Sequence, residues 1–189
     1  MAERPPTAAC GHLQLITGPA RSGKSRWAEH LARSSGLTVH YLATGPDLPD
    51  DPLWQARLVR HRARRPSSWS CHEVGADLAV ALASLPPADL ALVDSLGTWV
   101  SWGLELQEEV WSERVDALLA SLTDRCAPVL LVSEQTGWGV VPPTAIGGRF
   151  RDRLGTLEER LSGQCRHLWL VVAGRAMDLL ALSQPVPGC

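Results

Sequence analysis

The stretch Gly18-Pro19-Ala20-Arg21-Ser22-Gly23-Lys24-Ser25 decides the fold of this chain. An apolar run over 13–17 precedes it and a helical pattern over 24–34 follows, which predicts a strand, a glycine-rich turn and a helix in succession. Glycines let such a turn point its backbone N–H groups inward, and the helix adds its positive N-terminus. The stretch therefore predicts a phosphate-binding loop, in which Lys24 reaches the β- and γ-phosphates of a nucleotide and the Ser25 hydroxyl binds Mg²⁺.

Lys24 is the only lysine of the sequence, although its Lys and Arg residues together number 18. A coding bias toward arginine explains why the others are arginines, but it does not explain the position of the one lysine. A wide planar guanidinium does not replace a compact ammonium inside a phosphate loop. A chance glycine turn is the alternative interpretation, and the strand before the stretch and the helix after it argue against that.

Outward from this loop, short apolar runs alternate with helical patterns. The predicted strands are 13–17, 38–43, 70–74, 90–94, 129–133 and 167–173, and the predicted helices are 24–34, 53–64, 76–84, 108–122 and 149–161. Such alternation predicts an α/β fold of the P-loop NTPase type, with a mostly parallel sheet and helices on both faces. We expect one domain over residues 13–182, with a flexible N-terminal segment over 1–12 and a flexible tail over 183–189.

Composition excludes several classes of protein. The chain has 189 residues, of which 45% are hydrophobic and 20% charged, as in a folded globular protein rather than a disordered one. A net charge of −2 argues against a general nucleic-acid binder. Five widely spaced cysteines without a Cys-x-x-Cys pair favour neither a disulfide framework nor a zinc site. No signal peptide and no membrane-spanning apolar run is evident, so we expect a cytoplasmic protein.

Asp94 ends the most buried-looking run of the sequence, Leu90–Val93. An acid at the end of such a strand positions the metal ion in P-loop folds. A solvated acid at a strand end is the ordinary alternative, and the phosphate loop favours the metal interpretation. We therefore expect Ser25 and Asp94 to hold Mg²⁺.

A basic segment surrounds His61. Its charged members are Arg57, Arg60, His61, Arg62, Arg64 and Arg65. A solvated helix face is one interpretation; a nucleic-acid patch is another, which the lack of interleaved aromatic residues disfavours. The third is a second phosphate-handling site, because positive neighbours favour the neutral imidazole, whose lone pair can attack a nucleotide α-phosphate. Arginines would then neutralise the developing charge.

Several stretches resemble one enzyme family, in the same order along the chain. They are 17–26, 41–44, 57–66, 94–96, 137–142, 149–152 and 169–174, together with Trp69, Glu73 and Trp99. Many nucleotide-binding proteins share the phosphate loop, whereas the Arg-x-x-x-His-Arg-x-x-Arg-Pro pattern around His61 and the Gly-x-Gly-x-x-Pro pattern from Gly137 are more specific. Over about residues 13–175 the chain resembles the bifunctional adenosylcobinamide kinase / adenosylcobinamide-phosphate guanylyltransferase family.

The resemblance implies an enzyme of cobalamin biosynthesis that uses GTP, ATP and Mg²⁺. It would phosphorylate the aminopropanol hydroxyl of adenosylcobinamide, then transfer GMP from GTP to that phosphate through a guanylyl-histidine, giving adenosylcobinamide-GDP. His61 matches the family's histidine, and we assign it and Lys24 as catalytic residues. A homo-oligomer, with a trimer as the family's form, is also implied. The matched nucleotide-contacting residues are Gly18, Pro19, Ala20, Arg21, Ser22, Gly23, Lys24, Ser25, Ala43, Thr44, Gly45, Arg62, Ala63, Arg64, Arg65, Glu73 and Asp94.

The chain departs from the family pattern at a few positions. Glu134-Gln135 stands where Asn-Glu is usual, Gly97-Thr98 and Trp102 replace a Thr and an Asn, and Glu158 replaces an Asn. A glutamine cannot act as a carboxylate base or as a metal ligand of the same charge. In a strand, the neighbouring Glu134 side chain would point to the opposite face. We expect both activities to be kept. The alternatives are a P-loop small-molecule kinase without nucleotidyl transfer, and a GTP- or corrinoid-binding module that has lost catalysis.

Overall fold

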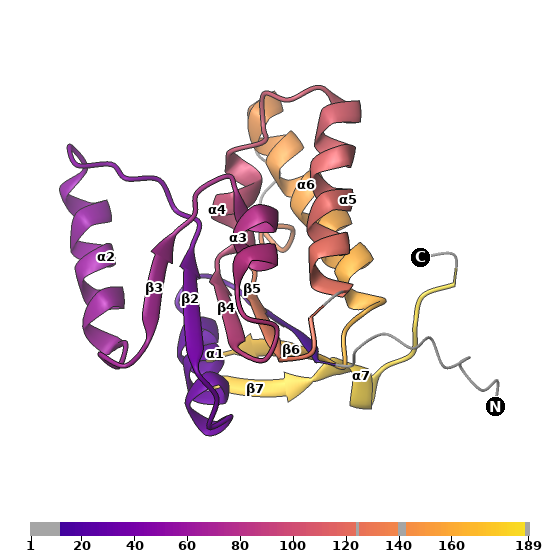
Figure 1. Ribbon diagram of the computed structural model, residues 1–189. Coiled ribbons are helices and arrows are strands. Elements are labelled where there is room, and N and C mark those ends of the chain that lie inside the picture. Colours follow the sequence, from indigo (N-terminus) through magenta and orange to yellow (C-terminus); the bar gives the residue numbers. More distant parts are fainter. Residues whose placement is uncertain (1–11, 124, 140–142, 188–189) are drawn as a thin grey trace.

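The chain folds around a seven-stranded sheet in the computed structural model, which describes residues 12–123, 125–139 and 143–187 (Figure 1). The strand order is β3-β2-β4-β5-β1-β6-β7, and neighbouring strands are parallel except for β6 and β7. The strands are β1 (Leu13–Thr17), β2 (Val39–Ala43), β3 (Ser70–Glu73), β4 (Leu90–Asp94), β5 (Val129–Val132), β6 (His167–Val172) and β7 (Arg175–Asp178). The predicted α/β class with a mostly parallel sheet is confirmed.

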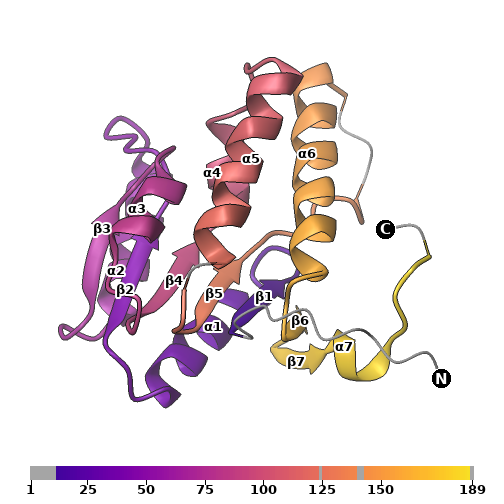
Figure 2. The ribbon, with the colours of Figure 1, turned by 45° about the vertical axis from the view of Figure 1, so that its right-hand side comes forward.

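Helices cover both faces of this sheet, as predicted (Figures 1 and 2). Helix α1 packs on one face, and α3, α4, α5 and α6 pack on the other. The helices are α1 (Lys24–Ser34), α2 (Pro52–Arg64), α3 (Leu78–Ser84), α4 (Leu96–Ser101), α5 (Glu108–Thr123), α6 (Ala145–Ser162) and α7 (Leu179–Leu182). In the part of the chain described, no helix is both long and apolar enough to span a bilayer.

The apolar run of β4 is buried on both sides of the sheet. Leu90 and Leu92 pack toward α1, whereas Ala91 and Val93 pack into the core under α3 to α6, because successive side chains of a strand point to opposite faces. Trp99 of α4 is fully buried in the core under α3 to α6. This two-sided burial explains why the strand has no polar alternation and why an acid is tolerated only at its end.

Strand order brings three connecting loops together at one edge of the sheet. Strand β5 lies between β4 and β1, and all three are parallel, so their carboxyl ends meet at that edge. The residues that follow them are Asp94 and Ser95, Ser133 and Glu134, and the loop that begins at Gly18. Ligands of open α/β sheets bind outside these carboxyl ends.

Three short elements were not predicted from the sequence: α4, β7 and α7. Helix α4 is six residues long and is fixed by its N-cap, where the Ser95 hydroxyl accepts the Thr98 backbone N–H. Strand β7 has little apolar pattern and is fastened to β6 by antiparallel pairing and by a 2.6 Å contact between His167 Nδ1 and Asp178 Oδ2. Helix α6 begins at Ala145, four residues before the predicted start at 149, because Thr144 caps it.

Candidate functional site

The loop over 18–23 is shaped by close backbone contacts. A Cβ on Gly18 would lie 2.2 Å from the carbonyl oxygen of Val171, so β6 leaves no room for a side chain there. Gly23 has a φ of 103°, a left-handed conformation that glycine adopts readily. The turn is held by backbone hydrogen bonds from Ser22 N to Pro19 O and from Gly174 N to Ser22 O. The predicted glycine-rich turn between strand and helix is therefore present.

The side chains of Ser22 and Lys24 lack a good hydrogen-bond acceptor or donor among the described residues. Lys24 is buried, and its Nζ lies 3.5 Å from the Pro19 carbonyl oxygen, which is long for a hydrogen bond from an ammonium. The buried hydroxyl of Ser22 finds no hydrogen-bond partner among the described residues. A ligand rich in oxygen atoms would satisfy both groups, as the predicted role of the loop requires.

Asp94 joins the phosphate loop to His61. Its Oδ2 accepts a 2.7 Å hydrogen bond from the Tyr41 hydroxyl and lies 3.7 Å from His61 Nδ1, and the Ser25 side chain lies close enough to help lower the pKa of this carboxyl group. Burial would raise the pKa of Asp94, but the contacts with His61 and Tyr41 outweigh it and hold the pKa below its ordinary value. The carboxylate is therefore ionised and lies beside His61, the predicted nucleophile.

One pocket gathers much of the predicted nucleotide site outside the loop. Its lining includes the predicted residues Ala43, Gly45, His61, Arg62, Arg65, Glu73 and Asp94. Arg62 forms an ion pair with Glu73, and the Arg65 guanidinium lies 3.5 Å from the centre of the Tyr41 ring. We call this the His61 pocket. Its mixture of cations, aromatic surface and the ionised Asp94 carboxylate suits a nucleotide with its phosphates.

Three predicted contact residues lie outside the lining of the His61 pocket. Thr44 is fully buried, and its hydroxyl donates to the Ser95 carbonyl oxygen at 2.6 Å. It therefore holds Ser95, which lines the pocket, without lining the pocket itself. Ala63 is exposed on α2. Arg64 instead holds buried Glu29 of α1, with Nη2 2.9 Å from Glu29 Oε1. Direct nucleotide contact by these residues stays a prediction.

Sequence reasoning missed the roles of Tyr41, Glu29 and Glu134. Glu134 and Gln135 contact different partners, as expected. Glu134, rather than Gln135, lies near Lys24 of the phosphate loop. Its Oε2 accepts the Gly97 backbone N–H at 3.0 Å, and the charge of Lys24 acts on it. Burial raises the pKa of Glu134, and hydrogen bonding from Ser95 and the Lys24 charge only partly offset this. The sequence feature that could have indicated this position of Glu134 is the glycine at position 97, which leaves room for the carboxylate.

The residues at which this chain departs from the family pattern contact one another or residues of the site. A Cβ on Gly97 would lie 2.2 Å from Glu134 Oε2, so the glycine makes room for the glutamate. Gln135 Nε2 donates to Glu158 Oε2 at 3.2 Å, and the Thr17 hydroxyl donates to Oε1 of the same carboxylate at 2.7 Å. Trp102 Nε1 donates to the Thr44 carbonyl oxygen at 2.8 Å. These residues therefore form complementary contacts around the loop and the His61 pocket.

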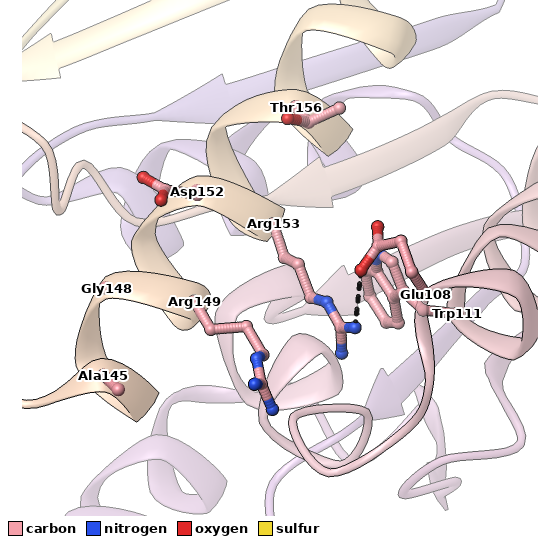
Figure 3. A pocket seen from close by; sticks show the side chains of 8 residues that line it. All are labelled: Glu108, Trp111, Ala145, Gly148, Arg149, Asp152, Arg153 and Thr156. Atoms are coloured by element: carbon pink, nitrogen blue, oxygen red, sulfur yellow. Dashed lines mark hydrogen bonds and ion pairs between the residues drawn. The ribbon is translucent and has the colours of Figure 1, made fainter.

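A separate hollow lies between α6 and the segment that leads into α5 (Figure 3). Arg153 extends from α6 toward Glu108, with 2.8 Å between Nη2 and Oε2, and Arg149 lies beside it. Arg153 also donates to the Gly103 carbonyl oxygen at 2.6 Å, and Arg149 donates to the Leu104 carbonyl oxygen at 2.8 Å. These arginines fasten α6 to the α4–α5 connection, and the hollow contains none of the predicted catalytic residues.

Comparisons with known proteins agree with this geometry. Residues 14–179 match a family model described as "Cobinamide kinase / cobinamide phosphate guanyltransferase". The bifunctional adenosylcobalamin biosynthesis protein CobP of Pseudomonas aeruginosa is 40% identical over 170 residues, covering 87% of this chain and 95% of its own. The CobU proteins of Escherichia coli and Salmonella typhimurium, with the same description, are 32% and 33% identical over 175 residues, 85% of this chain and 95% of theirs.

Among solved structures, the RadB recombinase matches 86% of this chain and 74% of its own, at 19% identity and a TM-score of 0.48. The family match extends from β1, before the phosphate loop, to the start of α7, and so includes the phosphate loop, Asp94 and His61. This chain belongs to the cobinamide kinase / cobinamide phosphate guanyltransferase family.

Proposed function

We propose that this chain phosphorylates adenosylcobinamide with ATP or GTP and then transfers GMP from GTP to adenosylcobinamide phosphate, giving adenosylcobinamide-GDP. Membership of the family and the names of its relatives support both steps. The observation that carries the proposal is the position of Asp94, whose carboxylate lies 3.7 Å from His61 Nδ1 and close to Ser25 of the phosphate loop. One site therefore contains the groups that each transfer needs.

In the first step the phosphate loop holds the nucleotide triphosphate. Backbone N–H groups of the loop and the start of α1 bind the phosphates, and Lys24 neutralises charge on the transferred group. The Ser25 hydroxyl and the Asp94 carboxylate fit Mg²⁺, because this ion prefers oxygen ligands and binds few protein groups alongside phosphate oxygens and water. The ion would supply charge neutralisation at the phosphates.

In the second step His61 is the nucleophile. Its Nδ1 faces Asp94 at 3.7 Å, which orients the ring and leaves Nε2 as the attacking atom. A bond forms between Nε2 and the α-phosphorus of GTP, the bond from that phosphorus to the β-phosphate oxygen breaks, and pyrophosphate leaves with the electron pair. The phosphate of the acceptor then attacks the same phosphorus and displaces His61. Arg62 and Arg65, which line the pocket, neutralise the developing charge.

A product assay with two labels tests the proposal. Label from the γ-phosphate of ATP should move to adenosylcobinamide, and label from the α-phosphate of GTP should then appear in adenosylcobinamide-GDP. Lys24→Ala should abolish both transfers, whereas His61→Ala should abolish the second alone. Transfer of the γ-phosphate without GMP transfer would favour a simple kinase, and GTP binding without turnover would favour a binding module; either result would contradict the proposal.

We also propose a cytoplasmic homotrimer, as the resemblance to the family favours. Light scattering on the purified chain should then give three times the 20.5 kDa mass of one chain. A monomer at micromolar concentration would contradict the trimer.

A further inference from the structure

A second hollow opens beside the phosphate loop, where the Gln135 backbone N–H donates to the Gly18 carbonyl oxygen at 3.0 Å. It has a volume of about 620 Å³ and lies between the segment Glu134–Gly137 and helix α6, where Arg151, Gly155 and Glu158 line it. We call it the β5–α6 hollow. None of its lining residues belongs to the His61 pocket, so the two are distinct spaces.

Glu134 connects this hollow to the phosphate site. Its side chain lines the hollow, while its Oε2 is fixed by the Gly97 backbone N–H at 3.0 Å. The charges of Lys24 and Asp94 act on the same carboxylate, and the Ser95 side chain lies close to it. Asp94 and Ser95 in turn line the His61 pocket. Glu134 therefore links the hollow to the charge of Lys24 and to two residues that line the His61 pocket.

Phosphoryl transfer needs such an arrangement. The attacking oxygen and the leaving oxygen lie roughly in line with the transferred phosphorus, so nucleotide and acceptor must reach it from different directions. Strand β5 separates β4 from β1, and Glu134 follows it directly beyond Ser133, between the loop and Asp94. A carboxylate at this place can accept the proton that an attacking hydroxyl must lose.

We propose that the β5–α6 hollow binds the hydroxyl-bearing arm of the acceptor and that Glu134 takes the hydroxyl proton during phosphoryl transfer. The inference rests on the proposed kinase step and adds its acceptor site and its base. A bond forms between the acceptor oxygen and the γ-phosphorus, and the bond from that phosphorus to the β-phosphate oxygen breaks. The nucleoside diphosphate leaves with the electron pair, and the proton passes to a Glu134 oxygen and then to water in the hollow.

The lining of the hollow fits an acceptor that is polar before and after this step. Thr136 and Thr156 bring hydroxyl groups and Gln135 a side-chain amide, which suit a hydroxyl or amide-bearing arm. Arg151 adds a guanidinium, paired at 2.7 Å with the adjacent Asp152. A guanidinium suits the phosphate that the acceptor carries after the first transfer.

Two glycines of α6 allow a matched steric test. A Cβ on Gly155 meets no atom within 4 Å, and this residue lines the β5–α6 hollow. Gly148, two helical turns earlier, is equally open but does not line this hollow; it lines the neighbouring hollow beside Glu108, which shares Asp152 and Thr156 with it. Replacement of either by leucine favours the helix, because glycine is among the poorest helix formers, so neither variant is expected to misfold.

The experiment measures phosphorylation of adenosylcobinamide in Gly155→Leu, Gly148→Leu and Glu134→Gln, with labelling of His61 by GTP alone as the acceptor-free reference. Gly155→Leu should raise the KM for adenosylcobinamide about tenfold or more, which corresponds to 1.4 kcal/mol, while Gly148→Leu keeps the wild-type KM. Glu134→Gln should lower kcat by about 10²–10⁴-fold, the usual contribution of a general base. The labelling of His61 should persist in all three variants.

Other outcomes overturn the inference. A wild-type KM in Gly155→Leu would show that the acceptor binds elsewhere, and an unchanged kcat in Glu134→Gln would remove the base. Parallel loss of phosphorylation and His61 labelling in Glu134→Gln would instead show that Glu134 supports the nucleotide site. If the wild-type protein does not phosphorylate adenosylcobinamide, the proposed function itself fails, which is a different result from failure of a variant.

Discussion

The contact between Arg64 and Glu29 fastens the helix that carries His61 to the helix that follows the phosphate loop. Glu29 of α1 is 2% exposed, and Arg64 of α2 donates to its Oε1 through Nη2 at 2.9 Å and through Nε at 3.3 Å. Arg33 reaches the other oxygen at 3.7 Å and also donates to the Arg64 carbonyl oxygen at 2.7 Å. The family resemblance predicts that Arg64 contacts the nucleotide, and the structure shows its contact with Glu29.

The substitution Arg64→Leu should therefore destabilise the protein. Breaking a fully buried ion pair costs about 3–5 kcal/mol, because one charge stays buried without a partner. Here the Arg64 side chain is 35% exposed and Arg33 remains near Glu29, so we expect a smaller loss of about 2 kcal/mol. For a chain of this length that loss lowers Tm by about 4–8 °C.

A double-mutant cycle measures the contact itself. Glu29→Gln, Arg64→Leu and the double variant are compared by urea unfolding, and the double variant should be more stable than the sum of the two single losses predicts. Labelling of His61 by GTP should slow in Arg64→Leu because α2 loses its attachment to α1. A coupling free energy near zero, together with a raised KM for GTP, would refute this reasoning. It would show that Arg64 acts on the nucleotide instead.

Further predictions concern the loop, Asp94 and the edge of the sheet. Tyr41→Phe removes the hydroxyl that donates to Asp94 at 2.7 Å, so the free energy of unfolding should fall by about 1.5–3 kcal/mol, as measured in urea. Gly18→Ala places a Cβ 2.2 Å from the Val171 carbonyl oxygen, so calorimetry should show that GTP affinity drops at least about tenfold; unchanged affinity would contradict the predicted loop. Burial would raise the pKa of Asp178, but contacts with His167 and the Leu168 N–H lower it below 3.8, so its ionised form stabilises β7. The stability advantage of the wild type over Asp178→Asn should be present above that value and disappear as the pH falls through the lowered pKa of the folded protein; a pH-independent difference in Tm would contradict this.

Local pattern was enough to predict the sheet and the phosphate loop. The run over 90–93 predicts a strand buried on both faces, and the glycines before Lys24 predict a turn between β1 and α1, because those features depend on residues close together in the sequence. The same is true of Asp94, whose position at the end of that strand brings it to the edge where parallel strands terminate.

Contacts between distant residues could not be predicted in this way. Glu29 and Arg64 are 35 residues apart, and no periodicity in either helix indicates that they meet. The position of Glu134 was missed because β5 ends at Val132 and the chain then turns toward Gly97, 37 residues earlier. Strand β7 depends on its pairing with β6 rather than on its own residues. In each case the deciding interaction is tertiary, so it leaves no local pattern.

A covalent adduct on His61 tests the central claim most directly. The protein is incubated with GTP labelled at the α-phosphate and Mg²⁺, without a corrinoid, and the labelled peptide is identified by mass spectrometry. A phosphoramidate is labile in acid and stable in base, so we predict an adduct with those properties on His61 that is absent from His61→Ala. No adduct in the wild type, or an adduct that persists in His61→Ala, would contradict the account.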